Sequence, residues 1–162
     1  MFRQAVRGDH KLALETFEKI KERNLQPNYQ SLCIHAKSCN NLKHAEEIFQ
    51  QIEESNMKVN AFLLRSLVAA AVQHRLYKVK GYEGLRYPDF YYLVYLIKQL
   101  KKHGVKANIQ IIHLFETVAF YAEKYNRWTC QDKEYERRIN SFRKAYNEWL
   151  RTTDAIDAAE AK

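Results

Sequence analysis

Glycine and proline are scarce in this 162-residue chain, which contains four Gly and two Pro. These residues supply most tight turns, and an all-β fold with many short strands needs more of them. Hydrophobic residues nevertheless make up 46% of the chain, which excludes a disordered polar sequence. The composition therefore favours a helical protein, long enough for one core or for a few stacked repeats.

Cysteine is also rare, with Cys33, Cys39 and Cys130 as the three examples. An odd number without paired spacing does not indicate a disulfide framework and favours a reducing compartment. Cys33 and Cys39 can be grouped with His35 and His44 as a zinc site, but the gaps of two, four and five residues match no standard zinc module. We therefore expect no metal and no cofactor.

Long apolar runs and catalytic clusters are absent as well. No run approaches the ~18–20 apolar residues that a membrane span needs, and Met1–Val6 lacks the apolar core of a signal peptide. The chain begins within a helical pattern, so we expect a fragment whose targeting segment lies outside it. The aspartates are scattered and no nucleophile–base arrangement stands out, so we expect no enzymatic activity.

Positive charge is in excess, with a formal net charge of +8 and an isoelectric point near 9.3. From Thr129 to the end, seven Lys/Arg residues balance seven Asp/Glu residues, so residues 1–128 carry the whole excess. This excess of positive charge indicates a polyanionic partner, either nucleic acid or an anionic surface. Charged residues that only keep a protein soluble would give the same composition.

A five-residue phrase occurs three times, at Asn24–Asn28, Asn56–Asn60 and Gly104–Asn108. Each copy has a small turn-former, an apolar residue, a polar or basic residue, a variable residue and then Asn. The copies are 32 and 48 residues apart, and repetition at roughly 30–50 residues is typical of a stacked repeat array. Each copy follows an amphipathic stretch, so we expect its first residue to end a helix in the left-handed conformation.

The hydrophobic periodicity predicts paired helices around these phrases. A break at residues 76–88 indicates an insertion loop between the two helices of one repeat. We divide the chain into repeats at 1–128 and a C-terminal helix at 129–162 that completes or caps the array. The expected helices are Lys11–Arg23, Tyr29–Ser38, Leu42–Ser55, Ala61–Arg75, Phe90–His103 with Asp89 as cap, Ile109–Trp128, and a last one that begins at Thr129 or Asp132.

Two features mark the last helix. Its aromatic-rich stripe has helical spacing and is expected to be core or a cap of the array rather than a partner face. The Ala-rich segment Thr152–Lys162 is expected to fray. The stripe consists of Tyr135, Ile139, Phe142, Tyr146 and Trp149.

These residues resemble the pentatricopeptide repeat (PPR) family. The run from Cys39 to Phe49, with Ile52 and the phrase that ends at Asn60, is similar to the family's second helix and its ending. The segment from Leu14 to Asn28 is similar to the same pattern. The resemblance covers most of residues 4–128 and looks most like degenerate animal or protist mitochondrial members, including leucine-rich PPR-motif and ribosome-associated types.

The resemblance implies an all-α, right-handed solenoid that binds single-stranded RNA, one base per repeat. It also implies a role in mitochondrial RNA metabolism, mRNA stability or translation, in the matrix, with mitochondrial mRNA or rRNA as the partner. The base-reading positions would be the residue that ends each repeat and one residue in its first helix. These positions fall on Asn28, Asn60 and Asn108 and on Arg65 and His113. The repeat that begins near Tyr29 is shorter in its first helix, and in this shorter repeat the position falls on Gln30 or Cys33.

Two alternatives stay open at this point. The three Asn residues can be simple helix terminators, and the whole chain can be a protein–protein scaffold docked on a mitochondrial ribosome or an RNA-processing complex. The insertion interleaves aromatic and basic residues, which suits stacking on bases and attraction to phosphates, but its tyrosines can instead pack on the loop's own helix pair or dock a protein. The insertion residues expected to contact RNA are Tyr77, Lys78, Lys80 and Arg86.

Overall fold

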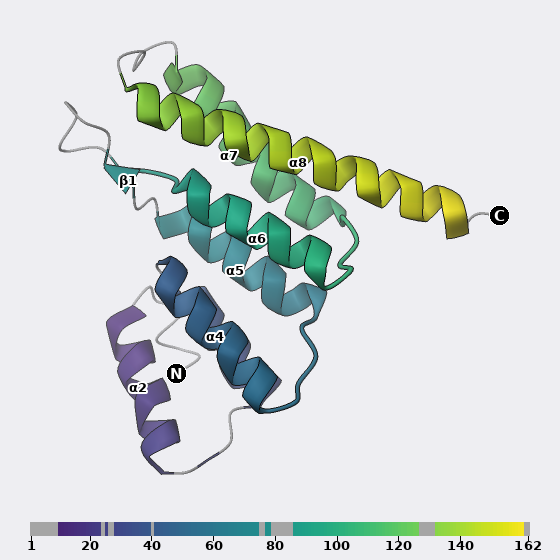
Figure 1. The fold of residues 1–162 in the computed structure, drawn as a ribbon. Coiled ribbons are helices and arrows are strands. Elements are labelled where there is room, and N and C mark those ends of the chain that lie inside the picture. The colour runs from purple at the N-terminus through teal and green to yellow at the C-terminus, as the bar shows by residue number, and fades with distance from the viewer. Residues whose placement is uncertain are drawn as a thin grey trace. The chain divides into compact units, whose positions relative to one another are not determined.

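A computed structural model describes residues 10–23, 25, 28–39, 41–74, 77–78, 86–126 and 132–160. Within them the structure is helical apart from one short strand pair (Figure 1). A helix lies at each predicted place, which confirms the helical fold class, whereas the right-handed solenoid stays a prediction. The elements are α2 (His10–Glu22), α3 (Tyr29–Lys37), α4 (Leu42–Glu54), α5 (Ala61–His74), β1 (Tyr77–Lys78), β2 (Arg86–Tyr87), α6 (Phe90–Lys102), α7 (Ile109–Asn126) and α8 (Lys133–Glu160).

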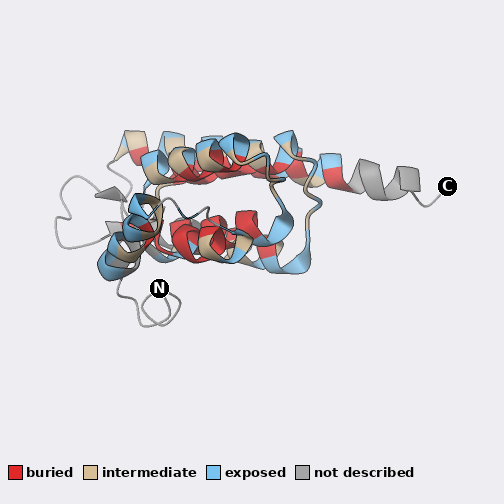
Figure 2. Cartoon of the chain, turned by 90° about the horizontal axis from the view of Figure 1, so that it is seen from below, coloured by how far each residue is buried: buried red, intermediate tan, exposed pale blue. Residues whose placement is uncertain are grey.

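The chain forms two compact units, Met1–Ala71 and Val72–Lys162. In the first unit, α3 contacts both α2 and α4. The apolar positions that share one face of each helix are buried, as the helical spacing predicts (Figure 2). The residues with no exposed surface in this unit include Phe17, Leu32, Ala45, Ile48, Leu63, Leu64 and Leu67.

In the second unit, α8 packs along α6 and also contacts α7. All five residues of the aromatic-rich stripe on α8 are at most 8% exposed. Rings from the three helices meet there, because Phe142 lies 5.2 Å from Phe90 and 5.8 Å from Phe115 between ring centroids. The interpretation of the stripe as core is therefore confirmed, and α8 completes the core of this unit.

The Ala-rich end of α8 is helical. The helix continues to Glu160, and the expected fraying of Thr152–Lys162 stays a prediction. Alanine has the highest intrinsic helix propensity, and extending an existing helix fixes one residue at a time without a new nucleus.

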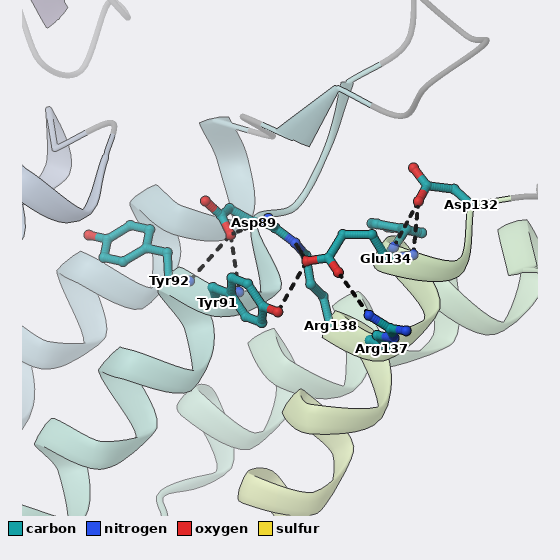
Figure 3. A network of polar contacts seen from close by, with 8 residues as sticks. Asp89, Tyr91, Tyr92, Asp132, Glu134, Arg137 and Arg138 are labelled. Carbon is teal, nitrogen blue, oxygen red and sulfur yellow. Dashed lines mark hydrogen bonds and ion pairs between the residues drawn. The ribbon is translucent and has the colours of Figure 1, made fainter.

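A polar network joins the beginnings of α6 and α8 (Figure 3). Asp89 caps α6 by accepting from the Tyr91 and Tyr92 N–H groups, which confirms the predicted cap. Asp132 caps α8 in the same way, so of the two predicted starts of this helix, Thr129 and Asp132, the second is confirmed. Arg138 lies between them: its guanidinium is 3.6 Å from Asp89 Oδ1 and 4.1 Å from the Tyr91 ring centroid, and its Nε donates to Glu134 Oε1 at 3.1 Å. The network fixes how α8 begins against α6.

The sequence predicts a loop throughout the insertion, but its two ends form strands. They pair in antiparallel fashion, with Tyr77 opposite Tyr87 and Lys78 opposite Arg86. Aromatic residues suit a paired, half-buried strand, which explains why these ends pair. Tyr87 is 5% exposed, and its ring centroid lies 5.4 Å from that of Tyr135 on α8. The Tyr87 ring therefore packs on α8, outside the helix pair that flanks the insertion.

Candidate nucleic-acid interface

The three phrase-ending asparagines begin helices rather than end them. The Oδ1 atom of Asn28 accepts a hydrogen bond from the Ser31 N–H at 2.8 Å. Asn60 and Asn108 do the same for the N–H groups of Leu63 and Ile111, each at 2.9 Å. A side-chain oxygen that satisfies an N–H of the first turn is the usual N-cap. Their interpretation as helix terminators is therefore wrong, because each serves the helix that follows it.

The first half of the phrase ends the preceding helix, as predicted. Asn56 and Gly104 adopt left-handed backbone conformations, with φ of 51° and 60°. After α4, the Asn56 N–H donates to the Glu53 carbonyl and the Met57 N–H donates to the Ile52 carbonyl. The same pair of bonds closes α6, and this pairing defines the Schellman motif. In the first copy, Asn24 lies outside the described residues.

Gly104 offers a direct test of this joint. A Cβ atom added there would meet no atom within 4 Å, so only the left-handed φ opposes a side chain. We expect Gly104→Ala to lower the free energy of unfolding by about 1 kcal/mol. Gly104→Asn is the matched control and should cost less, because Asn56 already holds this conformation in the other joint. Urea unfolding followed by tryptophan fluorescence measures both, and equal losses would contradict the strain argument.

A pocket of about 300 Å³ lies in the first unit where α3 meets the start of α5. Asn60 lines it together with both candidate first-helix residues of the shorter repeat, the exposed Gln30 and the buried Cys33. Because the cap occupies Asn60 Oδ1, its Nδ2 group is the part of the amide that can donate to a ligand. Burial raises the pKa of the Cys33 thiol above its usual value, so this wall of the pocket is uncharged.

Phe62 is a pocket residue that sequence reasoning missed. The apolar character of residues 61–75 predicts burial around most of the helix, yet the Phe62 side chain is 54% exposed and lines the pocket. It lies two residues after Asn60, in the first turn of α5. The sequence signal for its exposure was its position in the first turn after a helix cap, where a residue has few neighbours within the helix. Lys37 of α3 brings a cation to the same pocket.

The chain is similar to known proteins over most of its length. It is 26% identical over 143 residues to "Pentatricopeptide repeat-containing protein 1, mitochondrial" of Pongo abelii and 25% identical over 143 residues to that of Homo sapiens, with 88% of this chain and 18% of each relative covered. The Mus musculus protein of that name is 22% identical over 151 residues, covering 93% and 20%. These relatives confirm the resemblance to pentatricopeptide-repeat proteins. No family model and no solved structure matches the chain.

The PPR-like chain spans about one fifth of the length of these curated relatives. The other base-reading positions predicted from the sequence do not line the pocket. Arg65 is half-buried on α5 and is not among the pocket-lining residues, and His113 is exposed on α7. Asn28 is exposed at the start of α3, and Asn108 is exposed at the start of α7. Their contact with RNA stays a prediction.

The insertion of the PPR-like chain brings three of its four named residues to the strand pair. Tyr77 and Lys78 form β1, and the strand register sets Arg86 opposite Lys78, while Lys80 lies outside the described residues. Within the part of the chain that the structure describes, no group of three or more His, Cys, Asp or Glu side chains is arranged to hold a metal ion. No described helix is long and apolar enough to cross a membrane.

Proposed function

We propose that this chain is a non-enzymatic, single-stranded RNA-binding module of mitochondrial RNA metabolism or translation. One observation carries the proposal: the repeat-ending Asn60, the first-helix residues Gln30 and Cys33, and the exposed Phe62 surround one pocket. These are the residue types that unstacked bases need, namely amide groups for a base edge and a ring for a base face. The names of the relatives support the mitochondrial location.

The proposed mechanism uses each wall of the pocket differently. A base stacks on the Phe62 ring, and its acceptor atoms receive hydrogen bonds from Asn60 Nδ2, whose Oδ1 stays on the cap. Gln30 offers both a donor and an acceptor to the rest of the base edge. The net charge of +8 attracts the phosphates. Asn108, Arg65 and His113 belong to the next repeats, and Lys78, Lys80 and Arg86 of the insertion add phosphate contacts.

Removal of the Phe62 ring tests the proposal. Stacking on an aromatic side chain contributes ~1–3 kcal/mol per base, so Phe62→Ala should weaken RNA binding by about tenfold or more. Phe62→Trp keeps a stacking ring and is the control that should retain affinity. Because the side chain is 54% exposed, neither change should unfold the chain. Fluorescence anisotropy with labelled mixed-sequence single-stranded RNA measures the affinity.

Two variants of Asn60 separate the cap from the RNA contact. Asn60→Ser keeps a capping oxygen without adding charge but removes the Nδ2 donor, so it should bind RNA weakly at nearly normal stability. Asn60→Ala removes both and should also lose about 1 kcal/mol of stability. If the wild-type chain shows no salt-dependent binding to the RNA pool, the RNA role is wrong for this segment. The protein–protein scaffold then becomes the better interpretation.

A further inference from the structure

The joints before α5 and before α7 share one backbone design. Here a joint runs from the residue before the last helical turn to the next N-cap, residues 50–60 before α5 and residues 98–108 before α7. Both contain the paired terminal hydrogen bonds and a left-handed residue, and both end on a capping asparagine. They align without a gap at an offset of 48 residues. Each side chain of one joint therefore has a counterpart in the other.

The two joints carry opposite charge. Joint 50–60 has two glutamates and one lysine, a formal charge of −1, whereas joint 98–108 has four lysines and no acidic residue, a formal charge of +4. No Asp or Glu occurs anywhere between Asp89 and Glu116. All four lysines are exposed. The matching positions are Lys98 for Gln50, Lys101 for Glu53, Lys102 for Glu54 and Lys106 for Lys58.

The backbone hydrogen bonds of this joint do not require lysine at these four positions. Joint 50–60 makes the same backbone hydrogen bonds with acidic residues in place of Lys101 and Lys102. The helix dipole favours cations in the last turn of α6, but Lys98 precedes that turn and Lys106 lies beyond the helix end. Grouped like charges also repel one another, which works against stability. A polyanionic ligand explains the grouping where the backbone does not.

The start of α7 differs from the start of α5 in a complementary way. Gln110 stands at the position that Phe62 occupies after Asn60, so α7 offers no aromatic ring there. Gln110 and His113 are exposed polar residues. Joint 98–108 thus leads to a surface that combines cations and polar groups and lacks the exposed phenyl ring found after Asn60, which suits phosphates better than base faces.

We infer that residues 98–108 form a sequence-independent clamp for the phosphodiester backbone of single-stranded RNA, whereas the pocket beside α5 holds a base. The inference rests on the RNA-binding role proposed above. It assigns different contacts to the two regions: Asn60 at the end of joint 50–60 and Phe62 in the first turn of α5 contact a base, and the four lysines of joint 98–108 contact phosphates. Binding at the clamp releases counterions and is therefore strongly dependent on salt.

The test compares two variants of the full chain that lose the same charge. The clamp variant changes Lys98, Lys101, Lys102 and Lys106 to Gln. The control variant changes four other exposed lysines to Gln, namely Lys11, Lys19, Lys133 and Lys144. Anisotropy with labelled oligo(U) and oligo(A), repeated over a series of salt concentrations, gives the slope of log K against log salt.

We expect the clamp variant to lose about 0.7 of the slope for each phosphate contact removed, and so up to about 3 in total. Its affinity should fall by the same factor for oligo(U) and oligo(A). Phe62→Ala should lower affinity with the slope unchanged. The reciprocal variant Glu53→Lys with Glu54→Lys should steepen the slope. Equal losses of slope in the clamp and control variants, or an unchanged slope in the clamp variant, would overturn the clamp.

The outcomes distinguish this inference from the proposed function. If Phe62→Ala weakens binding but the clamp variant does not, the clamp is wrong and the base pocket stands. If the wild-type chain binds neither oligonucleotide, the proposed function fails and the clamp fails with it. Sedimentation with phosphatidylcholine vesicles containing phosphatidylglycerol is the last comparison. Lysine-dependent binding to these vesicles but not to RNA would overturn the assignment to RNA and indicate an anionic membrane surface.

Discussion

Replacement of Phe142 by alanine is expected to lower the free energy of unfolding of the second unit by about 3–5 kcal/mol. Phe142 has no exposed surface and lies where α6, α7 and α8 meet. Its ring centroid is 5.2 Å from that of Phe90, 5.8 Å from that of Phe115 and 5.9 Å from that of Tyr146. Alanine would remove these ring contacts and leave a cavity, since the rigid helices around it can close only in part.

Intrinsic fluorescence in urea isolates this effect, because both tryptophans, Trp128 and Trp149, lie in the second unit. The exposed Asn140 on the same helix supplies the matched control, and Asn140→Ala should change stability by no more than about 0.5 kcal/mol. Phe142→Leu should lose less than Phe142→Ala, because leucine fills part of the ring volume. A Phe142→Ala loss no larger than that of Asn140→Ala would mean that the aromatic cluster is not the core.

The buried face of α8 could be predicted from the sequence because its spacing alone determines which residues share a side. Steps of four and three from Tyr135 to Trp149 keep five large side chains on one stripe of a helix. The helix ends after α4 and α6 were predictable for a similar reason. A residue such as Gly104 that tolerates a left-handed backbone, followed by an apolar residue, is a local signal for termination.

The function of Asn60 could not be assigned to the correct helix from the sequence. Asn is common both where helices end and where they begin, and the choice depends on whether its Oδ1 reaches an N–H three residues later. The exposure of Phe62 could not be predicted either, because an apolar run does not show which of its side chains are covered by other helices. The strands β1 and β2 have two residues each, which is too short for a period of two to be visible.

His35 illustrates the same limit at a titratable residue. In the sequence it is considered only with Cys33, Cys39 and His44, as a poor match to a zinc site. In the structure it is 3% exposed on α3, and its ring centroid lies 4.0 Å from that of Phe17 on α2. Within the described part of the chain, its Nδ1 atom has no hydrogen-bond partner. His35 is therefore a core residue, and its environment opposes a positive charge.

The pKa of His35 is lowered to about 4, first by burial and then by the nearby positive charges of Lys21 on α2 and His44 on α4. In the unfolded chain the same side chain has a pKa near its ordinary value of 6.5. As the pH falls below 6.5, the unfolded state takes up a proton that the folded state does not, and protons then favour unfolding. The stabilisation from a neutral His35 is complete above pH 6.5 and is lost between pH 6.5 and about 4.

We expect this loss to reach about 3 kcal/mol, since one unit of pKa difference corresponds to about 1.4 kcal/mol. His35→Phe keeps an aromatic ring beside Phe17 but cannot titrate. Unfolding free energies of the wild type and His35→Phe are measured by far-UV circular dichroism in urea at a series of pH values. Their difference should be constant above pH 6.5, and below it the wild type should lose stability faster. Asn140→Ala is the control, because Asn140 is exposed on α8 and cannot titrate, and its profile should run parallel to that of the wild type.

The comparison depends on the pH slope and not on the absolute stability, so any constant repacking cost of the His35→Phe substitution cancels. All other titratable groups are present in both proteins, so their contributions cancel in the same way. NMR titration of the six histidines measures this directly. One imidazole resonance, absent from His35→Phe, should keep the chemical shift of the neutral ring until the pH approaches 4. Parallel stability profiles of the wild type and His35→Phe would show that the folded chain does not hold His35 neutral.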